Sequence, residues 1–103
     1  MNKKSREKLR EIKAGYNAVK QKLSATNEEM GELEQKLDYL SFEEQYKVDN
    51  TPENLQNSDR YYDREELASA LADIASAAVD LTTDCEALIN AISELLSDID
   101  DIC

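Results

Sequence analysis

The chain has 103 residues, of which 23 are Asp or Glu and 12 are Lys or Arg, so its net charge is −11 at pH 7. With two Gly, one Pro and no Trp, it holds too few turn-forming residues for a β-sandwich or a barrel. Because it has no His, it lacks the commonest general base and the commonest metal ligand, and the composition argues against an enzyme, a metal site or a cofactor site.

The first expected element is a helix over about residues 3–47. Apolar residues recur there at alternating steps of three and four, the spacing of one helical face. They are Leu9, Ile12, Tyr16, Val19, Leu23, Met30, Leu33, Leu37 and Leu40, and Thr26 occupies the position between Leu23 and Met30. A capping-box pattern from Thr26 to Glu29, with Gly31 behind it, could break this helix near residues 24–31. Since the apolar spacing continues across that stretch, one helix is favoured.

A connection over residues 48–58 follows and contains the only Pro, Pro52. Proline suits the first position of a helical turn and biases the preceding residue away from the helical region. We therefore expect Thr51 to cap a short turn from Pro52 to Leu55. Ser58 or Asp59 is expected to cap the next helix.

The second long helix is expected over about residues 59–103. Its apolar residues at steps of four and three are Leu67, Leu71, Ile74, Ala78, Leu81, Cys85, Leu88, Ile92, Leu95, Ile99 and Ile102. Beside them lies a second file, which comprises Ala68, Ala75, Thr82, Ile89, Leu96 and Cys103. One partner helix cannot cover so wide a stripe.

The second file predicts self-association. We expect Ala68, Ala75, Ile89 and Leu96 to form the interface of a symmetric homodimer, a four-helix bundle or coiled coil. On this interpretation Leu88→Asp unfolds the protein, whereas Ile89→Asp gives monomers.

Charge favours an antiparallel pairing of the two helices. Residues 1–24 contain eight Lys or Arg and two acids, whereas ten acids and no basic residue follow Arg64. Each distribution opposes its own helix dipole, and an antiparallel hairpin sets the cations beside the acids. The fold class is therefore all-α, a single helical-hairpin domain over residues 1–103.

The tip of this hairpin is the first candidate for partner binding. Its polar and aromatic residues are Asn54, Gln56, Arg60, Tyr61, Tyr62 and Arg64. Tyr and Arg are favoured at binding hot spots. One hypothesis is a non-enzymatic module that binds a protein partner there, and another is a site for an anionic ligand such as a nucleotide. The alternative is structural, with Arg60, Tyr61 and Arg64 closing the hairpin.

Glu28, Glu29 and Glu32 form a second candidate, an acidic flank on the first helix. It is either a solvated helix face or an acidic mimic that occupies a groove meant for nucleic acid. The acids near the basic segment argue against direct nucleic-acid binding, and the absence of a long apolar run argues against a membrane span. A cytoplasmic location is expected, with Cys85 a buried structural thiol and Cys103 exposed.

The stretch Asp49–Ser58, followed by an acidic, Ala-rich helix, resembles small uncharacterised helical proteins of low-GC Gram-positive bacteria and their phages. The resemblance covers at most Phe42 to the end of the sequence. It implies a helical fold and a phage-encoded modulator or inhibitor of a host defence process, acting in the host cytoplasm. It implies no role for an individual residue.

Overall fold

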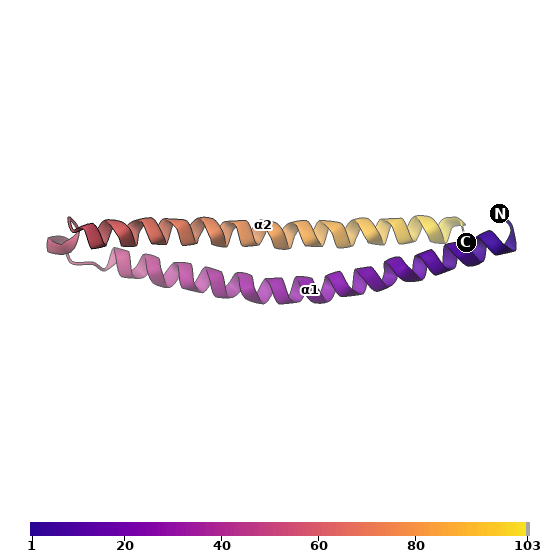
Figure 1. The fold of residues 1–103 in the computed structure, drawn as a ribbon, viewed down its shortest axis with the longest axis horizontal. Coiled ribbons are helices and arrows are strands. Elements are labelled where there is room, and N and C mark those ends of the chain that lie inside the picture. Colours follow the sequence, from indigo (N-terminus) through magenta and orange to yellow (C-terminus); the bar gives the residue numbers. More distant parts are fainter. Residues whose placement is uncertain (103) are drawn as a thin grey trace. The chain divides into compact units, whose positions relative to one another are not determined.

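The structure, a computed structural model, describes residues 1–102 and contains two long helices. Helix α1 covers Lys3–Asp49 and helix α2 covers Asp59–Ile102, with the short 3-10 helix η1 over Glu53–Leu55 between them (Figure 1). No strand occurs in these 102 residues. The all-α helical hairpin is confirmed, and both helix starts agree with the predicted ones. The expected exposure of Cys103 lies outside the described residues.

Helix α1 is continuous through residues 24–31, as the apolar spacing predicts. The capping-box pattern at Thr26 is not used, because apolar positions on both sides of it belong to one helical face. The predicted end at residue 47 is two residues too early.

The connection begins and ends with side-chain caps. Ser58, one of the two predicted candidates, is the N-cap of α2: its Oγ accepts the Tyr61 backbone N–H at 3.1 Å and donates to the Leu55 carbonyl at 2.8 Å. The predicted cap at Thr51 is wrong, because η1 has no side-chain cap and follows Pro52. Thr51 Oγ1 instead donates to the Lys47 carbonyl at 2.9 Å and satisfies the last turn of α1.

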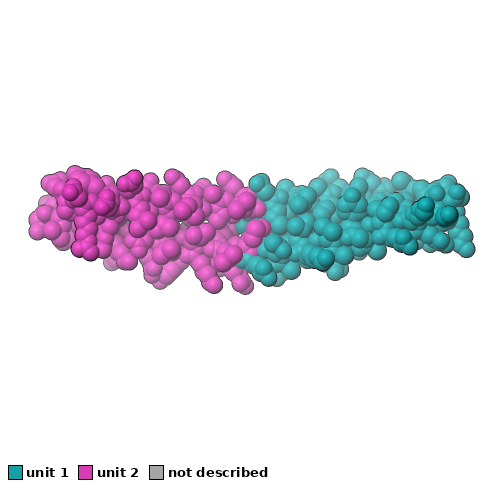
Figure 2. Space-filling view, in the orientation of Figure 1, with its two compact units in different colours: residues 1–29, 82–103 teal, residues 30–81 magenta. Residues whose placement is uncertain are grey.

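The helices belong to two compact units, shown in different colours in Figure 2. Unit 1 joins residues 1–29 to residues 82–103, and unit 2 comprises residues 30–81. That the whole chain is one domain stays a prediction.

Unit 1 shows the predicted antiparallel pairing. Lys13 of α1 forms an ion pair with Asp100 of α2, and the Cys85 thiol lies 3.8 Å from the Leu23 carbonyl oxygen. Residues early in α1 thus meet residues late in α2, and one ion pair between a cation and an acid joins them. Because the ion pair is largely exposed, it stabilises the unit by about 0–1 kcal/mol.

Unit 2 contains the connection and the helical segments on either side of it. Its most buried side chains are Ala68 and Val48, which are 1% and 5% exposed. Ala68, Ala75 and Val48 lie on the facing sides of the two helices. This small core positions the tip residues.

The residues of α2 that face α1, which we call the seam, occupy two files along the helix. One file agrees with the prediction, and the other is shifted by one residue. At alternating steps of three and four, the buried or half-buried positions are Ala68, Leu71, Ala75, Ala78, Thr82, Cys85, Ile89, Ile92, Leu96 and Ile99. The predicted dimer interface, Ala68, Ala75, Ile89 and Leu96, therefore lies inside the chain's own hairpin. The prediction that these four residues face outward is therefore wrong. The half-buried Cys85 agrees with a structural thiol.

Helix α1 shows the same shift. Its buried or half-buried positions include Leu9, Lys13, Lys20, Leu23, Asn27, Met30, Glu34, Leu37, Ser41, Glu44 and Val48. Six of these eleven positions are therefore polar. Long polar side chains can lay their stems along the seam with their heads in water. Small residues such as Ala68 and Ala75 on α2 leave space for them.

Candidate functional site

On each unit, the large aliphatic residues that lie outside the seam form a second apolar surface, which we call the aliphatic flank. In unit 1 the flank comprises Ile12, Val19, Leu88, Leu95 and Ile102. In unit 2 it comprises Leu33, Leu40, Leu67, Ile74 and Leu81. All ten side chains are between 37% and 61% exposed. They are larger than many of the residues that the hairpin buries, so the most apolar surface of each unit faces solvent.

Both helices contribute to the same side of each unit. Apart from Ile102, every flank residue directly precedes a seam position, as Ile12 precedes Lys13 and Leu88 precedes Ile89. One residue corresponds to about 100° of rotation about a helix axis. In an antiparallel pair, residues with the same offset from the seam lie on the same side of the plane through both axes. The files of α1 and α2 therefore form one apolar surface per unit.

The flank of unit 1 is hollowed at a glycine. A shallow hollow of about 260 Å³ is lined by Ile12, Gly15, Tyr16 and Val19. A Cβ added at Gly15 would meet no atom within 4 Å. The hollow is of a size that a side chain of another helix can fill.

The tip contains a second hollow, of about 420 Å³, lined by Thr51, Leu55, Ser58, Arg60, Tyr61 and Arg64. The structure thus brings together three of the predicted tip residues, Arg60, Tyr61 and Arg64. Neither arginine forms an ion pair with an acid of residues 1–102. An anion could use these two guanidinium groups, although the surrounding unit is acidic.

The other tip residues divide into structural and exposed ones. Gln56 Nε2 donates to the Thr51 carbonyl at 3.1 Å, so this side chain holds the connection. Asn54 is exposed. The rings of Tyr61 and Tyr62 meet edge to face with centroids 5.9 Å apart, and Tyr62 is 52% exposed.

Tyr61 is half-buried and forms a side-chain hydrogen bond with Glu65. This hydrogen bond, burial and the charges of Glu65 and Asp49 together raise the pKa of Tyr61 above 10.0. The neutral phenol is the form that the tip favours. Because Glu65 belongs to the same helix as Tyr61, this hydrogen bond does not join the two helices, and the hairpin-closing role stays a prediction.

The predicted acidic flank is exposed. Glu28 and Glu29 belong to unit 1 and Glu32 to unit 2, and none of them forms an ion pair within the described part of the chain. Nothing in their geometry distinguishes an acidic mimic from a solvated helix face.

One surface was missed by the sequence reasoning. Tyr39, Phe42 and Tyr46 of α1 are 66%, 70% and 61% exposed, and we call them the aromatic row. Their spacing of three and four residues places them on one helical face, outside the seam. The same spacing is visible in the sequence, but the longer pattern of Leu and Ile indicates a different face of the helix.

Within residues 1–102, no helix is long and apolar enough to cross a membrane, and no group of His, Cys, Asp or Glu is arranged to hold a metal ion. Comparisons with protein-family models, with curated proteins and with solved structures found no match. The candidate surfaces therefore rest on their own geometry.

Proposed function

We propose that this protein is a non-enzymatic interaction module that assembles with a second copy of itself through its aliphatic flanks. The observation that carries this proposal is the exposure of ten large aliphatic side chains, five on one side of each unit. Full burial of a Leu or Ile side chain stabilises a protein by about 1.5–3 kcal/mol. Much of that stabilisation is unrealised while these side chains face water.

The direction of the apolar stripe on α1 supports a four-helix bundle. Its apolar residues occupy one seam file, which includes Leu23 and Leu37, and the flank file, which includes Val19 and Leu33. The centre of this stripe is turned by roughly 50° from the direction of α2, given about 100° per residue. In a square four-helix bundle the central axis lies roughly 45° from the direction of a neighbouring helix.

A second copy fits this surface because the flank is self-complementary. Both helices offer rows of Leu and Ile, and core-facing helices of a bundle need an apolar face of about three residues in seven. Helix α2 has such a face, formed by its two seam files and its flank file. Two hairpins that meet flank to flank would bring four helices together, and the two copies of α2 would each supply such a face.

The test compares neighbouring substitutions on α2. Leu88→Asp places a charge in the flank, and we expect a helical monomer, whereas Ile89→Asp places it in the seam and should unfold unit 1. Ala87→Asp adds the same charge on the exposed outer side and is the matched control. Light scattering measures the mass, and circular dichroism measures the helix content.

The wild type and Ala87→Asp should both have twice the chain mass at micromolar concentration. A wild type with the mass of one chain would contradict the proposal. A Leu88→Asp protein that retains the dimer mass would show that the flank is not the interface.

The hollow at the tip supports a second candidate function, the binding of a small anion such as a nucleotide. Arg60 and Arg64 both line it and have no acidic partner among residues 1–102. Arginine binds phosphate through paired N–H groups. Equilibrium dialysis with ATP should show binding that Arg64→Gln weakens and Lys36→Gln, on the outer side of α1, leaves unchanged. ATP that does not bind, or that binds both variants equally, would exclude this site.

A further inference from the structure

We propose that the aromatic row is a binding surface for a cationic amphipathic helix of another protein. This surface belongs to unit 2 alone and goes beyond self-assembly. The argument rests on the exposure, the shape and the charge of the outer face of α1 between residues 32 and 47.

The fold does not account for the aromatic row. Three of the chain's six aromatic side chains lie within eight residues of α1, and each is more than 60% exposed. In this segment the seam is formed by Leu37, Ser41 and Glu44. Monomeric proteins rarely gather large apolar groups in solvent, and Tyr is enriched among residues that dominate binding energies.

The rings stand between hollows that could receive the side chains of a partner helix. One hollow of about 480 Å³ is lined by Tyr39, Phe42, Glu43, Tyr46 and Lys47. Another, of about 660 Å³, is lined by Gln35, Asp38, Tyr39, Ser41, Phe42, Gln45 and Ala72. Phe42 and Tyr39 line both, so the two rings form a ridge with a hollow on either side. An amphipathic helix binds such a surface through residues spaced by three and four.

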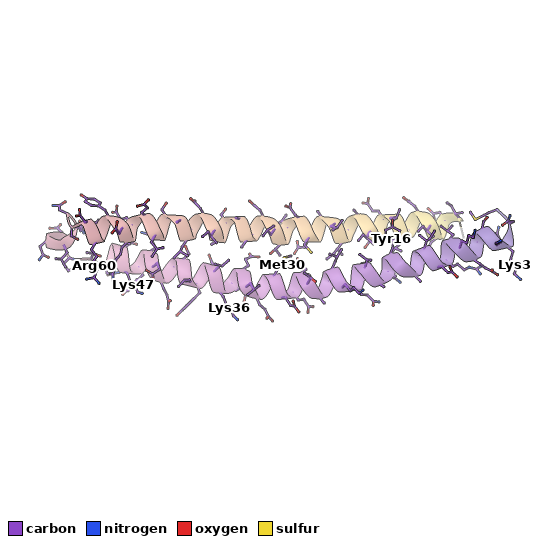
Figure 3. The ribbon with its side chains drawn as sticks, in the orientation of Figure 1. Lys3, Tyr16, Met30, Lys36, Lys47 and Arg60 are labelled. Carbon is purple, nitrogen blue, oxygen red and sulfur yellow. The ribbon has the colours of Figure 1, made fainter. Side chains whose placement is uncertain are left out.

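The charge around the rings selects a cationic partner. Asp38 and Glu43 line the hollows, and neither forms an ion pair with a residue of the described chain. Of the nearby cations, Lys47 is paired with Glu44 at 3.0 Å. Lys36 points away from α2 (Figure 3) and lines a further hollow with Tyr39, where the acids Glu32 and Glu43 outnumber it. Unit 2 as a whole contains 13 acidic and four basic residues. Lys and Arg side chains are attracted both to these carboxylates and to the faces of Tyr and Phe.

The aromatic row is separate from the aliphatic flank. Tyr39 and Tyr46 follow the seam residues Leu37 and Glu44 by two positions, which is about 200° of rotation. They therefore lie on the side of α1 opposite α2, and Phe42 lies on the side away from the flank. A dimer formed through the flanks would leave the aromatic row open.

A synthetic helical peptide of Leu and Lys with a single Trp provides the test. Because the protein has no Trp, indole emission reports on the peptide alone. We expect saturable binding with a blue shift of the emission, and Phe42→Ala should weaken the binding by about tenfold or more, as for a hot-spot residue. Tyr62→Ala removes an exposed ring at the tip and should leave the affinity unchanged.

A peptide with Ser in place of Leu has the same charge and separates specific binding from general attraction to an acidic protein. Equal binding of the two peptides, or an affinity that Phe42→Ala does not change, would overturn the proposal. A lower mass of the Phe42→Ala protein by light scattering, without any peptide, would show instead that a second copy covers the aromatic row.

Discussion

At the scale of single residues, the seam tolerates polar groups that the sequence pattern assigns to solvent. Asn27 is the clearest example, because its Oδ1 is buried in unit 1 without a hydrogen-bond partner. A buried polar atom without a partner costs about 1–3 kcal/mol. In helical bundles a single buried Asn can fix the alignment of the helices at a cost in stability.

Asn27→Leu should therefore raise the stability of the hairpin by about 1–2 kcal/mol, because it removes an unsatisfied group and adds apolar contact. Chemical denaturation followed by circular dichroism measures the change. Asn17→Leu, at an exposed position of α1, is the control and should change stability little. A destabilised Asn27→Leu protein would mean that the amide has a partner in the assembled state.

Tyr61 predicts a pH dependence at the tip. Its hydrogen bond with Glu65 raises the pKa of the phenol in the folded chain. Its contribution to stability is therefore complete below the ordinary pKa of 10.0 and is lost as the pH rises through the raised pKa. An absorbance titration of phenolate should show a late step that Tyr61→Phe removes and that Glu65→Gln moves to lower pH. A titration that neither substitution alters would contradict the role of this hydrogen bond.

At the scale of helices, the sequence predicts the elements better than their rotation. The apolar spacing is enough to predict two long helices and their starts, and it leaves Ser58 and Asp59 as the two candidate caps of α2. The apolar spacing of α2 is compatible with two seams, one through Leu67 and one through Ala68. The sequence alone favours the seam through Leu67, because leucine has the larger apolar side chain. The structure buries Ala68 and Ala75, because small residues on α2 let α1 approach closely. The apolar stripe of α1 does not point straight at α2 but is turned toward the aliphatic flank. The rotation depends on tertiary packing, which the spacing in one helix does not contain.

The two glycines within α1 allow a matched test of whether the aliphatic flank forms the dimer interface. Neither a Cβ at Gly15 nor one at Gly31 would meet an atom within 4 Å, and Ala is more favourable than Gly in a helix by about 1 kcal/mol. Both Gly→Ala substitutions should raise the helix stability. Only Gly15→Ala fills a hollow on the flank, so only this variant should weaken dimerisation, which analytical ultracentrifugation would detect. Equal dimerisation of the two variants would mean that no side chain of a second copy enters the hollow.

At the scale of the whole molecule, charge opposes the assembly that the aliphatic flanks favour. Each copy has a net charge of −11, so two copies repel one another at low ionic strength. Screening shortens the range of this repulsion from about 30 Å at 0.01 M salt to about 8 Å at 0.15 M. The dissociation constant of the dimer should therefore fall as salt is added, as measured by sedimentation equilibrium. A dissociation constant that rises with salt would indicate that ion pairs between copies dominate the interface.

The uneven placement of basic residues also determines which reagents can act on each helix. Helix α2 has no Lys or Arg after Arg64, whereas the first 24 residues contain eight of them. Trypsin cleaves after Lys and Arg, so its digestion should leave residues 65–103 as one fragment while it cuts α1 into short peptides. Acylating reagents that modify lysine side chains can likewise label α1 but not α2. The same difference restricts lysine acetylation or ubiquitination to one helix of the hairpin.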